Sequence, residues 1–297
     1  MKFNLLRFSL GLVFVWVAWT TYWDAGLYGD NVEQFVWVHS IEWGYPKHPP
    51  MPTWLLGLAI QLVGQHSWLT NALAAICFAI TGALTWQIAR ELFDKKTADI
   101  AIVLWTLQQC FSVSAQIYNH NTVLVMFLAA TVYAVLRAKR GRGAESKGEQ
   151  LAWWLGAGVF AGCAMLSKYQ AALPLFVLLI TVCIANRESP RQLITGVTLA
   201  TAGFAIVFSP HVYWAVINDF PALRYASAAI ESDRFVKRLA WIGSFFANQI
   251  RMVFPLLVAL GISFALCRIR RAPSHKNLSD EIPPNEASQV NPTSGWM

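Results

Sequence analysis

Long apolar runs alternate with short polar segments along most of the chain. Eight runs approach the roughly 20 apolar residues that cross a bilayer as a helix, so each is expected to span the membrane. They cover about residues 5–23, 68–92, 98–115, 122–136, 151–166, 171–185, 193–214 and 244–267. The pattern therefore predicts an all-α polytopic membrane protein with about eight transmembrane helices.

The segment 51–63 is apolar but too short to cross comfortably. If it did cross, the basic loop 137–147 (RAKRGRGAESK) would face outward, although lysine and arginine favour the cytoplasmic side. We therefore expect 51–63 to be an interfacial or re-entrant helix, preceded by a surface helix at 32–43. Both would belong to an outer loop at 24–67.

Composition agrees with a membrane protein. The chain of 297 residues is 56% hydrophobic and 13% charged, whereas soluble domains carry about 25% charged residues. The net charge of +7 is attributed to cytoplasmic loops, and no nucleic-acid partner is expected. The five cysteines lie in or beside apolar runs without a CxxC pair, so neither a disulfide framework nor a zinc site is predicted.

Two regions are expected. Residues 1–271 would form the transmembrane domain. Residues 272–297 are rich in Pro, Ser, Asn and Glu and would form a disordered cytoplasmic tail.

Ionisable residues gather in the outer loop. Asp30 and Glu33 share a face if the segment is helical, and such a pair suits a general base or a cation. The alternative is a solvated loop in which Asp30 caps the surface helix. His48 is stiffened by the prolines of KHPP, so it is a candidate metal ligand or phosphate contact, or else a surface histidine.

Four further candidates fall near the ends of predicted spans. Lys168 lies between two apolar runs and is either a cation for a lipid headgroup or pyrophosphate-like group, or a snorkelling residue. His120, His211 and Arg251 are the others. Ionisable residues at membrane depth are functional candidates by default. The histidines and Lys168 converge on the predicted outer face.

Soluble-nucleotide chemistry is not indicated, since the chain has no Walker, Rossmann, HExxH or nucleophile-elbow motif. A membrane enzyme without a nucleotide site would draw on a lipid-linked donor.

The outer loop resembles the first outer loop of GT-C membrane glycosyltransferases, in the branch of the aminoarabinose transferases and protein O-mannosyltransferases. The matching residues are Asp30, Trp43-Gly44-Tyr45 and His48-Pro49-Pro50-Met51. Four later segments resemble the family in the same order: LFDKKTADIAIVL, AGVFAGCAMLSKYQAALPLF, SPHVYWAVINDFPALRYA and FFANQIRMVFPLLVALGI.

The resemblance implies transfer of a sugar from a polyprenyl-phosphate carrier to a lipid, glycan or protein acceptor at the outer face of a bacterial cytoplasmic membrane. Asp30 would be the catalytic acid or base, with Glu33 as a second candidate. Lys168 would contact the carrier phosphate. Other substrate-binding candidates are His48, Tyr45, His211, Arg224 and Arg251. With a phosphate acceptor, Asp30 would instead position groups or hold a metal.

This chain departs from the family at two acids. Asn31 stands where a second acid often follows the first, and Asn121 stands where an acid usually precedes the fourth helix. A divalent metal is therefore uncertain, with Glu33, His48, His120 and His211 as candidate ligands. Relatives are also longer. Two alternatives stay open: a lipid-linked sugar transporter or flippase, and a non-catalytic subunit with a membrane-protein partner.

Overall fold

The computed structural model describes residues 4–23, 29–108, 115–140, 147–185, 189–231 and 235–271. The predicted tail at 272–297 and much of the basic loop at 137–147 lie outside these residues. The described elements are all helical: α1 (Leu5–Trp23), α2 (Gly29–Trp37), α3 (Met51–Val63), α4 (Leu69–Leu92), α5 (Lys95–Thr106), α6 (His120–Arg140), α7 (Lys147–Ser167), the 3-10 turn η2 (Tyr169–Ala171), α8 (Ala172–Ala185), α9 (Pro190–Ile217), α10 (Pro221–Glu231) and α11 (Phe235–Arg271).

Six of the described helices, α1, α4, α6, α7, α9 and α11, are long and apolar enough to cross a bilayer. They coincide with six of the predicted spans, which confirms the all-α, multi-pass fold class. Helices α5 and α8 occupy the remaining two predicted positions but have only 12 and 14 residues. Residues 109–114 of the predicted third span are outside the described part. The count of eight spans therefore stays a prediction.

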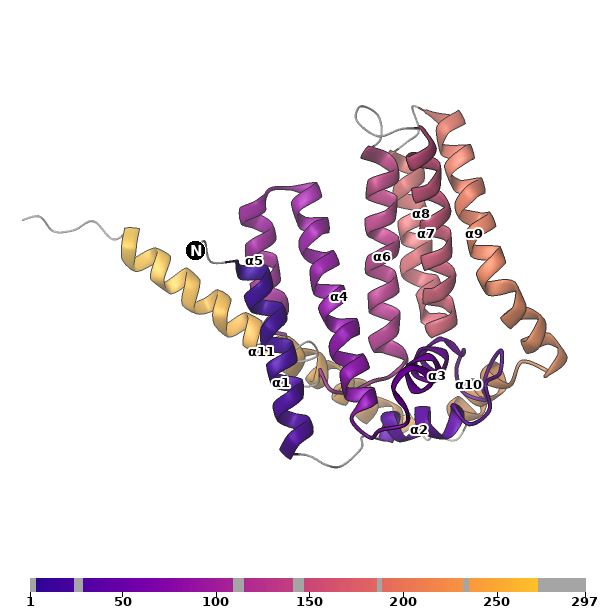
Figure 1. The fold of residues 1–297 in the computed structure, drawn as a ribbon. Helices are drawn as coiled ribbons and strands as arrows, with labels where there is room; N and C mark the ends of the chain where they lie inside the picture. The colour runs from indigo at the N-terminus through magenta and orange to yellow at the C-terminus, as the bar shows by residue number, and fades with distance from the viewer. Residues whose placement is uncertain are drawn as a thin grey trace, which may run out of the picture. The chain divides into compact units, whose positions relative to one another are not determined.

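The predicted outer loop forms two short helices. Helices α2 and α3 lie across one end of α4, α6 and α7 (Figure 1). Helix α3 has the bounds expected from its apolar run. Helix α2 begins earlier and ends earlier than the expected 32–43, because the chain turns after Trp37. The Tyr45 hydroxyl donates to the Ser40 carbonyl (2.8 Å), which holds this turn closed.

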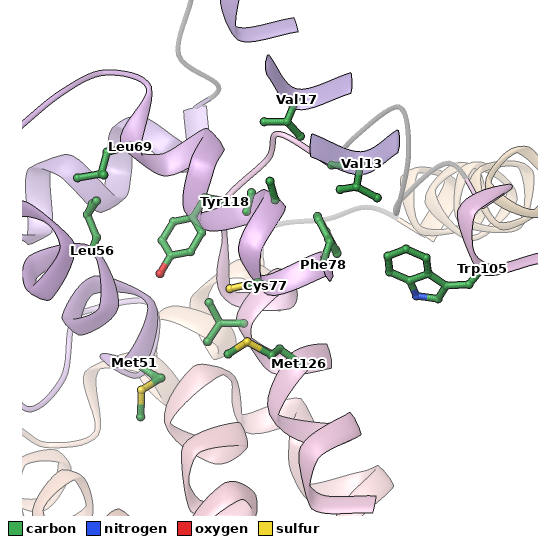
Figure 2. Close-up of a cluster of buried hydrophobic side chains, with 14 of the residues drawn as sticks. Val13, Val17, Met51, Leu56, Leu69, Cys77, Phe78, Trp105, Tyr118 and Met126 are labelled. Atoms are coloured by element: carbon green, nitrogen blue, oxygen red, sulfur yellow. The ribbon is translucent and has the colours of Figure 1, made fainter. Parts of the chain in front are cut away.

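A buried apolar cluster joins α1, α3, α4, α5 and α6 beneath the loop (Figure 2). Tyr118 is fully buried there, and its hydroxyl donates to the Pro52 carbonyl at 2.7 Å. This bond satisfies the only polar atom of a side chain that is otherwise apolar. Cys77 lies in the same cluster as a free thiol and packs there as a small apolar side chain.

Helices α7 and α9 approach closely through small residues. A side chain added at Gly158 would clash with the Ala200 carbonyl, and one at Gly203 would clash with the Leu155 carbonyl. Only glycine permits such an approach of two backbones. This packing fixes the end of α7, where Lys168 follows, against the region of α9 that carries His211.

Candidate active site

Residues 118–121 (Tyr-Asn-His-Asn) connect the candidate residues of the loop to the bundle. Asn119 caps α6, because its Oδ1 accepts from the backbone amides of Asn121 (2.9 Å) and Thr122 (3.1 Å). The other end of the same amide, Nδ2, donates to Asp30 Oδ2 at 2.8 Å. The start of α6 thus holds the carboxylate of a residue 89 positions away.

Asp30 is exposed in the first turn of α2. It is the second residue of the helix rather than its N-cap, and the helix dipole favours a carboxylate at this position. Its bond to Asn119 leaves the other carboxylate oxygen, Oδ1, without a hydrogen bond within the described residues. Asp30 can therefore accept a proton from a group that approaches from outside.

Lys168 lies on extended backbone between α7 and η2. Its ammonium donates to Asn121 Oδ1 at 2.9 Å. Burial lowers the pKa of Lys168, and the negative charge of Asp30 raises it in part. The Lys168 ammonium is half-buried, and its hydrogen-bond partner is a neutral amide. Because this partner carries no charge, the positive charge of Lys168 can attract an anionic ligand.

His48 and His120 form an aromatic pair with ring centroids 4.1 Å apart. The Trp37 ring lies edge-on to both, at 6.3 and 5.6 Å. His120 is 4% exposed, and its Nε2 has no hydrogen-bond partner within the described residues. Burial lowers the pKa of His48, and the positive charge of Lys168 lowers it further. Both influences favour the neutral form of the His48 ring.

Asn31 is fully buried and makes four hydrogen bonds. Its Nδ2 donates to Thr70 Oγ1 (3.0 Å), Asn71 Oδ1 (3.0 Å) and the Gln116 carbonyl (3.4 Å). Its Oδ1 accepts from the Tyr118 amide at 2.9 Å. An ionised aspartate could not make the bonds that Asn31 Nδ2 donates. The position at which the resemblance implied a second acid therefore anchors α2 to the bundle.

Glu33 is paired with Lys47 at 2.6 Å. The Lys47 ammonium also lies 5.6 Å above the ring of Tyr225 in α10. The hydrogen bond and charge of Glu33 raise the pKa of Lys47. Glu33 is therefore engaged with Lys47 rather than with Asp30.

His211 and Tyr45 are buried and join parts of the chain. The carbonyl of Trp43 can only accept, so His211 Nδ1 donates to it (2.6 Å), and the Tyr169 hydroxyl bonds Nε2 (2.7 Å). Tyr45 stacks on Trp37 with centroids 5.0 Å apart. Both residues therefore hold the loop in place through buried contacts.

The two predicted arginines are not brought to this cluster. Arg224 is exposed in α10 and donates to the Asn218 carbonyl at 3.2 Å. Arg251 is exposed on α11. Among the described residues, neither arginine forms a hydrogen bond, ion pair or ring contact with Asp30, His48 or Lys168.

A divalent metal does not fit these residues as they are arranged. The described part of the chain contains no group of three or more His, Cys, Asp or Glu side chains that could hold an ion. Among the four predicted ligands, only His48 and His120 lie together. Glu33 is occupied by Lys47, and both ring nitrogens of His211 have partners.

Sequence reasoning did not assign roles to Lys47, Asn119 or the structural Asn31. Asn119 precedes an apolar run, which is the signal of a helix cap. Its second bond to Asp30 has no such local signal.

Comparisons with known proteins identify the family. The model of the dolichyl-phosphate-mannose-protein mannosyltransferase family matches residues 47–214, more than half of the chain. This match includes His48, His120, Lys168 and His211 and begins after Asp30 and Glu33.

Curated relatives come from Rhizobium johnstonii. The chain is 21% identical over 232 residues to the lipid A galacturonosyltransferase RgtD, covering 77% of this chain and 46% of RgtD. It is 28% identical over 202 residues to the lipopolysaccharide core galacturonosyltransferase RgtB, covering 66% of this chain and 39% of RgtB. The chain thus spans less than half the length of these relatives.

Solved structures share the fold. ArnT from Cupriavidus metallidurans, bound to undecaprenyl phosphate, is similar with a TM-score of 0.59 and 18% identity, covering 73% of this chain and 42% of ArnT. The apo oligosaccharyltransferase of Archaeoglobus fulgidus is similar with a TM-score of 0.55 and 15% identity, covering 94% of this chain and 40% of that enzyme. These similarities confirm the predicted GT-C fold.

Proposed function

The chain belongs to the dolichyl-phosphate-mannose-protein mannosyltransferase family, and we propose that it moves a sugar from a polyprenyl-phosphate carrier onto a lipid, glycan or protein acceptor. The observation that carries this proposal is the pairing of Asp30 and Lys168 through one segment. Asn119 binds the carboxylate and Asn121 binds the ammonium, only two residues apart. A proton acceptor and a cation are thereby held at the same end of the bundle.

The chemistry assigns one group to each side of the sugar. The bond between the anomeric carbon and the carrier phosphate breaks, and a bond from the anomeric carbon to the acceptor oxygen forms, with inversion. Asp30 takes the proton from an acceptor hydroxyl as that oxygen attacks. The carrier phosphate leaves with its electron pair, and the Lys168 ammonium stabilises its charge. With a phosphate acceptor no proton needs removal, and Asp30 would position the acceptor.

The remaining loop residues line or support the site. His48, neutral and next to Lys168, is assigned to the donor pocket. Tyr45 and His211 are assigned to positioning, because both are buried with their polar atoms bonded within the chain. The loop would face the outside of the cytoplasmic membrane, since that orientation leaves the basic connections on the cytoplasmic side.

The names of similar proteins suggest substrates for a first assay. ArnT was solved with undecaprenyl phosphate, which supports this carrier. The two curated relatives are named for galacturonosyl transfer to lipid A and to lipopolysaccharide core. A galacturonosyl donor and an envelope glycolipid acceptor are therefore the first pair to test.

The deciding experiment is sugar transfer in membranes by wild type and Asp30→Asn at matched expression. Asp30→Asn should lose about 10²-fold or more, because it removes a general base. Glu42→Gln is the matched control: it neutralises an exposed acid of the same loop that bonds Ser40. Equal transfer by wild type and Asp30→Asn would remove Asp30 from the mechanism. Activity that appears only after adding a second membrane protein would favour the subunit alternative.

A further inference from the structure

A polar pocket of about 270 Å³ lies between α4 and α6. It is lined by Trp86, Gln87, Arg90, Glu91, Tyr133 and Arg137. The other pockets described here, between α1 and α4 and among α6 to α9, are lined mainly by apolar side chains. We call this polar cavity the far-end pocket, because the proposed active site lies at the opposite ends of the same two helices.

Helix geometry places the far-end pocket at the other membrane interface. On α4, Gln87 lies 16 residues beyond Asn71, which bonds to Asn31 at the site. That separation corresponds to a rise of about 24 Å along the helix. The hydrocarbon core of a bilayer is about 30 Å thick. The pocket therefore lies near the headgroups of the leaflet opposite the proposed active site.

Both arginines of the pocket are oriented by aromatic rings. The Arg90 guanidinium lies 5.4 Å above the Trp86 ring, and that indole is itself fixed by donating to Asp99 Oδ1 at 2.9 Å. The Arg137 guanidinium lies 5.2 Å from the Trp153 ring and donates to the Tyr133 hydroxyl at 3.2 Å. Stacking on an aromatic face leaves the in-plane N–H donors of Arg90 for an anion.

Charge and surroundings favour a lipid over a soluble ligand. Two arginines and Glu91 leave one net positive charge at the pocket. Leu92 and Phe93, at the end of α4, are 55% and 71% exposed and offer apolar contact beside it. Basic pockets between transmembrane helices at a membrane face suit the headgroups of anionic lipids.

We propose that the far-end pocket binds the phosphodiester headgroup of an anionic phospholipid from the leaflet opposite the active site. Arg90 donates to the phosphate oxygens, Arg137 contributes its positive charge, and the acyl chains extend along the exposed apolar end of α4. This site does not depend on the proposed transfer reaction, because none of its residues belongs to the catalytic loop.

The test is titration of the purified full chain with phosphatidylglycerol, counting bound lipid by native mass spectrometry and following the Tm. Arg90→Gln should weaken binding about fivefold, because one basic contact is lost. Lys96→Gln is the control: Lys96 is exposed at the same end and does not line the pocket. Glu91→Gln should strengthen binding, since it removes the opposing charge.

Four outcomes would overturn the proposal. Equal weakening by Arg90→Gln and Lys96→Gln would indicate diffuse surface charge instead of a built pocket. Equal binding of phosphatidylglycerol and phosphatidylcholine would show that an anionic lipid is not selected. Competition by inorganic phosphate at concentrations close to those of the lipid would indicate a site for soluble anions. Weaker binding by a normally folded Glu91→Gln would contradict the charge argument.

Discussion

At the end of the bundle that carries Asp30 and Lys168, polar groups are held across long stretches of chain. Asn119 bonds to Asp30 over 89 residues, Lys168 bonds to Asn121 over 47, and His211 bonds to Trp43 over 168. At the far end, several charged groups are held within one helical turn. Arg90 stacks on Trp86, Arg137 bonds to Tyr133, and Lys95 pairs with Asp99, each four residues apart.

This difference matches the role proposed for each end of the bundle. Bonds between residues four apart form wherever a helix forms, so these three pairs of the far end need little beyond secondary structure. A constellation that brings together a carboxylate, an ammonium and an imidazole needs groups from separate helices. Such groups can be oriented accurately only if buried side chains fix the helices relative to one another. The first three predictions below test the long-range contacts, and the last tests a local one.

The largest effect is expected from Asn31→Leu. Leucine leaves the buried partners of Asn31 on α4 and before α6 without their hydrogen bonds, at a cost of about 3 kcal/mol. We expect Tm to fall by roughly 5–10 °C in a thermal-unfolding assay. Asn248→Leu makes the same exchange at an exposed position and should change Tm little. A Tm for Asn31→Leu equal to that of wild type would show that the buried network does not hold this end together.

A smaller effect is expected from Asn121→Asp. The new carboxylate would pair with the Lys168 ammonium and compete with a carrier phosphate for its charge. Affinity for polyprenyl phosphate should fall about tenfold, which corresponds to roughly 1.4 kcal/mol. Equilibrium binding of the carrier measures this change. Gln170→Glu adds the same charge at an exposed position two residues from Lys168, and it should weaken binding less. Equal losses would mean that overall charge, and not the partner of Lys168, sets the affinity.

The pH dependence of stability tests the environment of His48. Burial is the main cause of its lowered pKa; nearby Lys168 and Lys47 lower it further, while Glu33 and Asp30 oppose the shift. Below about pH 6.5 the unfolded chain therefore binds a proton on His48 before the folded chain does. The contribution of His48 to the free energy of unfolding therefore decreases as the pH falls from about 6.5 through the lowered pKa of the folded state.

The variant His48→Asn should reduce the loss of Tm between pH 7 and pH 5. His39→Asn, an exposed histidine of the same loop, serves as the control. An identical pH profile for wild type and His48→Asn would contradict the lowered pKa of this half-buried ring.

The smallest effect is expected from Lys95→Gln at the far end. The Lys95 side chain is 70% exposed, and such pairs contribute about 0.5 kcal/mol or less. Tm and transfer activity should both stay close to wild type. A large loss of either would show that the far end depends on more than local contacts. Asp99→Ala should cost more than Lys95→Gln, because it also removes the acceptor of the Trp86 indole.

Asn31 and Asn121 show how much of the candidate site could be predicted from the sequence. The loop, its prolines and the candidates Asp30, His48 and Lys168 could be identified from the chain alone. The two asparagines were interpreted as losses of acids. The structure shows them as hydrogen-bonding partners, one buried in the anchor of α2 and one bonded to Lys168. Their roles depend on groups from distant segments, which no local pattern reports.

The sequence by itself determined the membrane-spanning helices and the short helix α3, because apolar run length decides whether a segment can cross a bilayer. The helix cap at Asn119 and the four-residue pairs of the far end also depend only on residues within a few positions, although neither was predicted. Only the tertiary structure decided that the segment 118–121 lies between Asp30 and Lys168. That placement follows from the packing of separate helices, including the close approach of α7 to α9 through Gly158 and Gly203. Burial and hydrogen bonding between distant segments are set by packing, so a one-dimensional pattern could not supply them.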